Sequence, residues 1–215
     1  MSSRRPARRD GDDRRSSSAA DRPLGALRDV VGRRRSRAAR RTWRRRARGR
    51  EAPAASAGEA TGPRTPDFRA RDRRQAVILY LDTSALVKLY VDEPGRERVE
   101  AAVRNAERIA TVRVTYAEAR AAFARQRRER AITARDLRTL VRALDEDWAS
   151  LAVVEVTEAS VRAAGDLAER HALRAYDALQ LAAAVQLHAE GATVAFCSFD
   201  VRLSRAARRQ RLTLA

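Results

Sequence analysis

Short apolar runs alternate with amphipathic segments from residue 76 to the end of the chain. Between the runs, apolar residues recur every three or four positions, as on the buried face of a helix. Strands that alternate with helices predict an α/β fold with a central parallel sheet flanked by helices. Strands are expected at 77–81, 109–114, 151–156, 193–197 and 212–214, where β-branched and aromatic residues are frequent.

Seven helices are expected in the same part of the chain. The longest apolar series is Leu137, Leu140, Val141, Leu144 and Trp148, and the helix after it presents Val161, Ala164, Leu167 and Ala168. Gly191 is a natural stop for the helix that precedes it. The remaining helices are expected over 84–90, from Pro94 onward, over 115–128, over 175–190 and over 201–209.

Residues 1–75 differ in kind from the rest. They hold 24 Arg against 9 Asp or Glu, a net charge of +15, whereas residues 76–215 carry the remaining 22 basic and 19 acidic groups, a net of +3. A segment so poor in aliphatic residues cannot offset its ordering entropy, so we expect a disordered, dispensable basic extension before a domain at 76–215. Such an extension would arise if the true start codon were that of Val77 and the start had been assigned too early. Its arginine clusters suit non-specific binding to nucleic acid.

Composition narrows the class of protein further. Cys197 is the only cysteine, so an internal disulfide is excluded, and we expect a buried apolar role for it on a strand. No apolar run reaches the 18 residues of a membrane span, and the basic N-terminus lacks the apolar core of a secretory signal. The sequence therefore predicts a cytoplasmic protein.

Four carboxylates stand where apolar runs give way to helices: Asp82, Glu118, Asp177 and Asp200. In a parallel α/β sheet such positions converge on the crevice beyond the carboxyl ends of the strands. Carboxylates gathered there repel one another unless a cation lies among them, and an oxygen-only set suits Mg²⁺ or Mn²⁺. Hydrolysis or transfer at a phosphodiester is the common use of such a metal site.

Each acid also has a purely structural interpretation. Thr115 and Glu118 have the spacing of a capping box, Asp82 and Asp200 can cap helices, and Asp177 suits the positive end of a helix dipole. Ser84 and Ser198 lie two residues from Asp82 and Asp200, where a hydroxyl can orient a metal carboxylate or close a local turn.

Other chemistry finds little support. His171 and His188 lack zinc-like spacing and are expected at helix ends, and no glycine-rich phosphate loop follows a strand. A series of arginines can steer nucleic acid toward the acids or form a solvated helix face: Arg120, Arg125, Arg127, Arg128 and Arg130.

The segments around the acids resemble the PIN domain, and specifically VapC-type toxins. Residues 79–90 (LYLDTSALVKLY) resemble its opening, residues 173–182 (LRAYDALQLA) its third-acid segment and residues 196–203 its fourth, while residues 115–118 match the less distinctive second. The likeness covers nearly all of residues 77–215, in order, and departs from the family in the long basic extension.

The resemblance implies a three-layer PIN-like fold and a metal-dependent endoribonuclease, the toxin of a toxin–antitoxin pair. Its catalytic and metal-binding acids would be Asp82, Glu118, Asp177 and Asp200, with Ser84 and Ser198 as supporting polar groups. RNA would be the substrate, an antitoxin protein the partner, and a homodimer the usual assembly. A nucleic-acid-binding module that does not cut, and a nuclease directed at DNA, stay open as alternatives.

Overall fold

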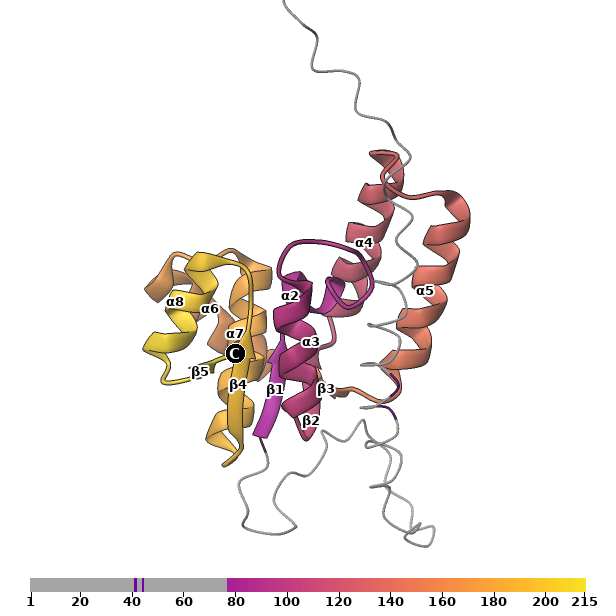
Figure 1. Ribbon diagram of the computed structural model, residues 1–215. Helices are drawn as coiled ribbons and strands as arrows, with labels where there is room; N and C mark the ends of the chain where they lie inside the picture. Colours follow the sequence, from indigo (N-terminus) through magenta and orange to yellow (C-terminus); the bar gives the residue numbers. More distant parts are fainter. Residues whose placement is uncertain (1–40, 42–43, 45–76) are drawn as a thin grey trace, which may run out of the picture. The chain divides into compact units, whose positions relative to one another are not determined.

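The computed structural model describes residues 41, 44 and 77–215. Its strands form one parallel sheet in the order β3-β2-β1-β4-β5, with β1 in the middle (Figure 1). The α/β fold and all five predicted strands are confirmed, with boundaries that shift by one or two residues. The strands are β1 (Val77–Leu81), β2 (Arg108–Val112), β3 (Ala152–Val154), β4 (Thr193–Cys197) and β5 (Thr213–Leu214).

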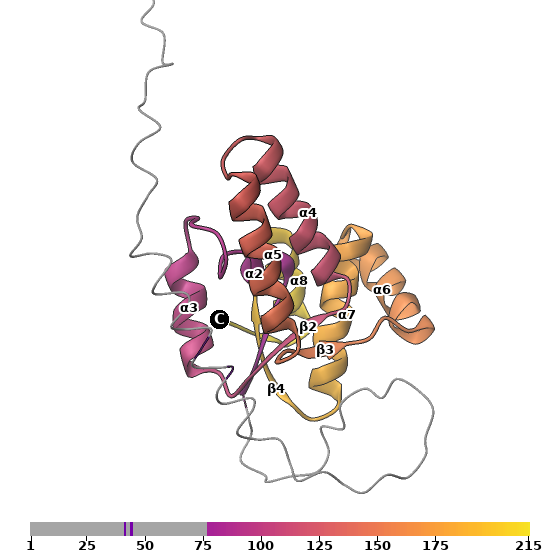
Figure 2. The ribbon, with the colours of Figure 1, turned by 90° about the vertical axis from the view of Figure 1, so that its right-hand side faces the viewer.

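Helices cover both faces of the sheet, because successive side chains of a strand point to opposite sides. Leu79 and Leu81 pack with α2 (Thr83–Val87), α3 (Arg96–Asn105), α4 (Thr115–Arg128) and α5 (Ala134–Trp148). Ile78 and Tyr80 pack on the other face with α6 (Glu158–His171), α7 (Ala175–Ala189) and α8 (Val201–Arg209). The result is the predicted three-layer arrangement (Figures 1 and 2).

Three details differ from expectation. The first helix, α2, ends at Val87 and not at Tyr90. The next, α3, begins at Arg96 after Gly95, whose φ of 90° is left-handed, and a side chain at Gly95 would collide with the Phe199 ring. Val161 is expected on the buried face of its helix, together with Ala164 and Leu167. In the structure Ala164 and Leu167 pack into the core, whereas Val161 is 50% exposed.

The C-terminal end of α5 carries a buried carboxylate. Asp147 is fully buried, accepts a hydrogen bond of 3.0 Å from the Tyr90 hydroxyl and forms an ion pair with Arg44, which also contacts Glu146 at 3.3 Å. Arg41 and Arg44 have helical backbone, unlike the disorder expected there; the rest of the expected extension lies outside the described residues. Arg44 thus ties residues before the domain to its core.

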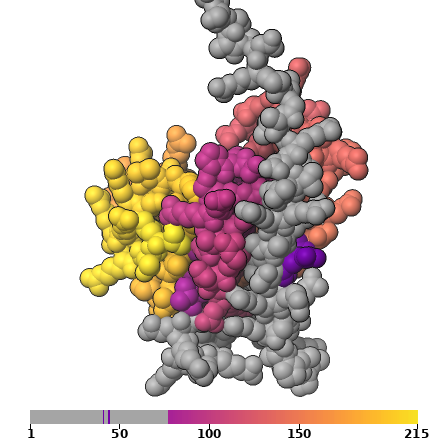
Figure 3. Space-filling model, in the orientation of Figure 1, coloured from indigo at the N-terminus to yellow at the C-terminus, as the bar shows by residue number. Residues whose placement is uncertain are grey.

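Residues far apart in the sequence meet on the face drawn in Figure 3. There the magenta segment that includes α3 lies beside the yellow C-terminal residues, and Arg98 of α3 donates a hydrogen bond to the Ala215 carbonyl. Cys197 is fully buried on β4, as predicted. None of the helices in the described part of the chain is long and apolar enough to cross a bilayer.

Candidate active site

Sheet register places Asp82 beside Ser198. Leu81 pairs with Cys197 in adjacent parallel strands, so the next residue of each strand emerges at the same edge. The Ser198 hydroxyl donates a 2.8 Å hydrogen bond to Asp82 Oδ2, and the Ser84 hydroxyl donates one of 2.8 Å to Oδ1. The Asp82 carboxylate is thereby fixed in orientation at the carboxyl end of β1.

Asp177 and Asp200 come from the first turn of α7 and from the N-cap of α8. Asp200 Oδ1 accepts a 2.7 Å hydrogen bond from the Leu203 backbone N–H. Partial burial, and then the negative charge of Asp200, raise the pKa of Asp177 above its ordinary value. The two carboxylates are therefore close enough to repel each other.

Glu118 does not close a capping box, so that alternative is wrong. The helix α4 has Val114 as its N-cap, with no side-chain cap bond, and the Glu118 carboxylate turns toward α2 and α7. It accepts hydrogen bonds from the Thr83 hydroxyl and, at 3.0 Å, from the Gln180 amide.

Thr83 and Gln180 were not identified from the sequence. Gln180 is 2% exposed, its amide N–H₂ lies 2.9 Å from the Thr115 hydroxyl, and its carbonyl accepts a 3.0 Å bond from the Tyr80 hydroxyl. A signal was present: Gln180 follows Asp177 by three residues, which places both on one face of α7.

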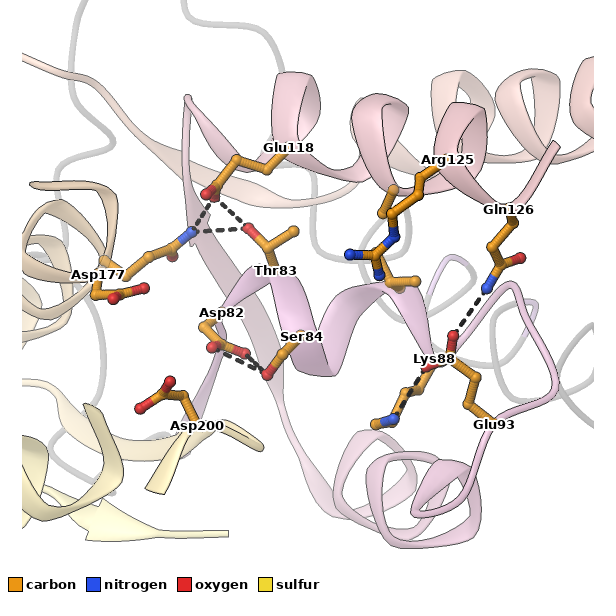
Figure 4. A pocket seen from close by; sticks show the side chains of 13 residues that line it. Asp82, Thr83, Ser84, Lys88, Glu93, Glu118, Arg125, Gln126, Asp177 and Asp200 are labelled. Atoms are coloured by element: carbon orange, nitrogen blue, oxygen red, sulfur yellow. Dashed lines mark hydrogen bonds and ion pairs between the residues drawn. The ribbon is translucent and has the colours of Figure 1, made fainter. Parts of the chain in front are cut away.

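All four acids line one pocket of about 330 Å³, together with Thr83, Ser84 and Gln180. Figure 4 shows their carboxylates gathered at one end of it. Burial raises the pKa of Asp82 from 3.8 to about 6; the hydrogen bonds from Ala85, Ser198 and Ser84 oppose this rise, and the charge of Glu118 adds to it. Asp82 and Asp200 cap α2 and α8 as well, so for these two residues the capping and site interpretations hold together.

The donor set fits a divalent ion. It consists of carboxylate and hydroxyl oxygens, and burial, followed by the charge of a neighbouring carboxylate, raises the pKa of Asp82 and Asp177. From residue 77 onward, no group of three or more Asp, Glu, His or Cys side chains lies close enough together to hold a metal ion. Mg²⁺ keeps several waters and needs only one or two carboxylates directly, so a more open arrangement suits it.

The remaining candidates lie elsewhere. His171 and His188 occupy the last turns of α6 and α7, as expected, and do not line the pocket. Of the five arginines of the series in and just after α4, Arg125 lines the pocket.

Comparison with known proteins places this site in a family. The family model described as "PIN domain" matches residues 79–209, a span that contains all four acids. Two curated relatives from strains of Mycobacterium tuberculosis, "Ribonuclease VapC45" and "Ribonuclease VapC49", are each 36% identical over 118 residues, which cover 55% of this chain and 82% of theirs. The chain belongs to the VapC-type PIN-domain family. The resemblance seen in the sequence is therefore confirmed.

A solved structure is also similar to this PIN domain. The "Crystal Structure of FitAcB from Neisseria gonorrhoeae" aligns with a TM-score of 0.49 and 19% sequence identity, over 63% of this chain and 95% of that one.

Proposed function

We propose that this VapC-type PIN domain is an endoribonuclease dependent on Mg²⁺ or Mn²⁺, and that it is the toxin of a toxin–antitoxin pair. The observation that carries the proposal is the convergence of Asp82, Glu118, Asp177 and Asp200, from four elements, on one pocket. The names of the two ribonuclease relatives support the choice of RNA as substrate.

Some pocket residues would bind the ion, and others would orient the carboxylates that bind it. Asp82 and Glu118, each fixed by hydrogen bonds from neighbouring side chains, would hold the ion with Asp177 and Asp200 beside them. A bound divalent ion supplies a Lewis acid that activates water and offsets charge on the phosphate. Ser84 and Ser198 keep the Asp82 carboxylate aimed into the pocket, and Thr83 and Gln180 do the same for Glu118.

The partners follow from the same site. An antitoxin segment that carries Arg or Lys would neutralise the carboxylates by charge-assisted hydrogen bonds and block the ion. Tyr176 and Val201, the chain neighbours of Asp177 and Asp200, are 58% and 65% exposed and are therefore open to contact with such a segment. We further propose a homodimer that acts in the cytoplasm.

The test is cleavage of single-stranded RNA by the full chain. Cleavage should require Mg²⁺ or Mn²⁺ and stop when a chelator is added, and Asp177→Asn should abolish it. Asp166→Asn, on the exposed face of α6, is the matched control and should cut normally. Equal activity in chelator, or in Asp177→Asn, would overturn the metal-site proposal.

The two alternatives give different results in the same assay. A DNA-directed nuclease would cut single-stranded DNA in preference to RNA, and a binding module would retain RNA without cutting it. The toxin role is tested separately by growth: expression of the chain should arrest a bacterial host, and co-expression of the small protein encoded next to it should restore growth. Harmless expression in several hosts would contradict that role alone.

A further inference from the structure

The pocket extends beyond the carboxylates along one face of α4. Glu118, Ala122 and Arg125 all line it, and their spacings of four and three residues place them in one row. Since a helix rises 1.5 Å per residue, Glu118 and Arg125 lie about 10 Å apart along the axis. The acids and the basic group are therefore separated by about two helical turns within the same pocket (Figure 4).

The far end of the pocket has the opposite chemistry from the first. It is formed by Lys88, Glu93, Arg125 and Gln126. Glu93 accepts hydrogen bonds from Lys88 at 3.1 Å and from Gln126 at 2.8 Å, so a three-residue bridge spans this end. Among the residues that line this end, two cations stand against one carboxylate.

The two cations differ in how free they are to meet a ligand. Lys88 is 8% exposed, paired with Glu93, and lies over the Phe199 ring at 4.5 Å, so it is fixed and partly neutralised. The Arg125 side chain is 66% exposed, and its ion pair with Glu129 is long, at 3.9 Å between two exposed groups. Exposed pairs of this kind hold their partners weakly. Arg125 is thus the group that can exchange its partner for a ligand.

Between the two ends the lining is small and apolar. Val87 of α2 and Ala122 of α4 contribute there, without charge or hydrogen-bonding groups in their side chains. Such a middle section suits a ribose or base better than a phosphate, because a phosphate buried without a partner loses its hydration.

We propose that the Arg125 end of the pocket is a second subsite, which binds an RNA phosphate one or two nucleotides away from the one cleaved. This proposal rests on the proposed ribonuclease function. The spacing of Glu118 and Arg125 along α4 would then set the distance between the phosphate that is cleaved, near Glu118, and a flanking phosphate at Arg125. The minimal good substrate is then longer than a dinucleotide. Lys88, Glu93 and Gln126 position the subsite and add a fixed positive field.

The test compares Arg125→Ala with Arg127→Ala, an exposed arginine of the same helix outside the pocket. Fluorescence anisotropy would measure binding of a labelled single-stranded RNA hexanucleotide across a range of monovalent salt. Both variants would carry Asp177→Asn to prevent cleavage, at constant Mg²⁺. Loss of one phosphate contact should reduce the slope of log K against log salt by about 0.7 and weaken binding about tenfold at low salt. Arg127→Ala should change neither.

Cleavage assays with Asp177 intact separate the subsite from the nuclease function. Arg125→Ala should lower kcat/KM for a hexanucleotide and leave that for a dinucleotide unchanged, while Arg125→Lys should restore part of the loss. Equal salt slopes in Arg125→Ala and Arg127→Ala would overturn the subsite even if the wild-type chain cuts RNA normally. Unchanged RNA binding with weakened inhibition by the antitoxin would likewise overturn it, in favour of a protein contact.

Discussion

The Ser198 hydroxyl donates a 2.8 Å hydrogen bond to Asp82 Oδ2, across 116 residues of sequence. The Ser198 hydroxyl oxygen also accepts a 3.0 Å hydrogen bond from the Asp200 backbone N–H. One hydroxyl therefore joins the ends of β1 and β4 to the start of α8, and it couples the position of one acid to that of another. The small size of Ser suits this role, because Asp82 and Ser198 are both buried at adjacent strand ends.

Ser198→Ala should raise the pKa of Asp82 further above its value of about 6, because the hydrogen bond that favours the ionised carboxylate is lost. A bond worth about 1 kcal/mol corresponds to a rise of about 0.7 in the pKa. Carbon-detected NMR titration of the metal-free protein would measure it. Ser204→Ala, on α8, is the control, and an unchanged Asp82 titration in Ser198→Ala would contradict the coupling.

Asp82→Asn should make metal-free protein more stable at neutral pH. The pKa of Asp82 is raised from 3.8 to about 6, so the folded state binds its proton more tightly than the unfolded chain. The wild type therefore loses stability as pH rises from about 4 to about 6, and the carboxamide does not. The rise of about 2 in the pKa of Asp82 corresponds to a free energy of unfolding that is up to about 3 kcal/mol higher in Asp82→Asn than in the wild type at pH 7.

Urea denaturation of both proteins across this pH range, with a chelator present, would measure the effect of Asp82→Asn. Asp166→Asn should follow the wild-type profile. Parallel profiles for wild type and Asp82→Asn would show that the ionisation of Asp82 carries no folding cost.

Gln180→Leu should weaken both the fold and the metal site. It leaves the buried Tyr80 hydroxyl without its 3.0 Å acceptor and removes one of the two side-chain donors to the Glu118 carboxylate, at a cost of about 1–3 kcal/mol of stability. Calorimetric titration with Mn²⁺ should show lower affinity. Gln186→Leu is the matched control, because Gln186 bonds to Glu190 on the same helix, away from the pocket. Equal Mn²⁺ affinity in the two variants would remove Gln180 from the site.

Arg44→Gln should destabilise the domain by about 2 kcal/mol, because it removes the positive charge that pairs with the buried Asp147 carboxylate. Asp147 and Glu146 also stand in the last turn of α5, where the helix dipole favours a cation. Thermal unfolding of the full chain would measure the loss, with the exposed Arg41→Gln as control. Equal melting temperatures for the wild type and Arg44→Gln would contradict this prediction and support the expectation from sequence that residues 1–75 are dispensable.

The pattern of apolar and polar residues was enough to predict the sheet and the edge of it at which two of the acids lie. A continuous apolar run such as 77–81 is sufficient to specify a buried strand, and an acid directly after it must emerge at the carboxyl edge. Asp82 follows in this way from local pattern alone, and Asp200 comes three residues after the apolar run at 193–197. Asp177 was found from its place in the first turn of an apolar helix and from the resemblance of its segment to the PIN family.

The hydrogen-bond partners of these acids depend on how the helices and strands pack against one another. From the sequence, Glu118 could belong either to a capping box or to the site. In the structure it accepts hydrogen bonds from Thr83 and from Gln180, 62 residues away, because α2, α4 and α7 converge there. The pairing of Arg44 with Asp147 spans 103 residues and leaves no periodic signal in the chain. Hydrophobic period fixes the face of an element, whereas contacts between elements depend on crossing geometry and side-chain reach, which no local pattern encodes.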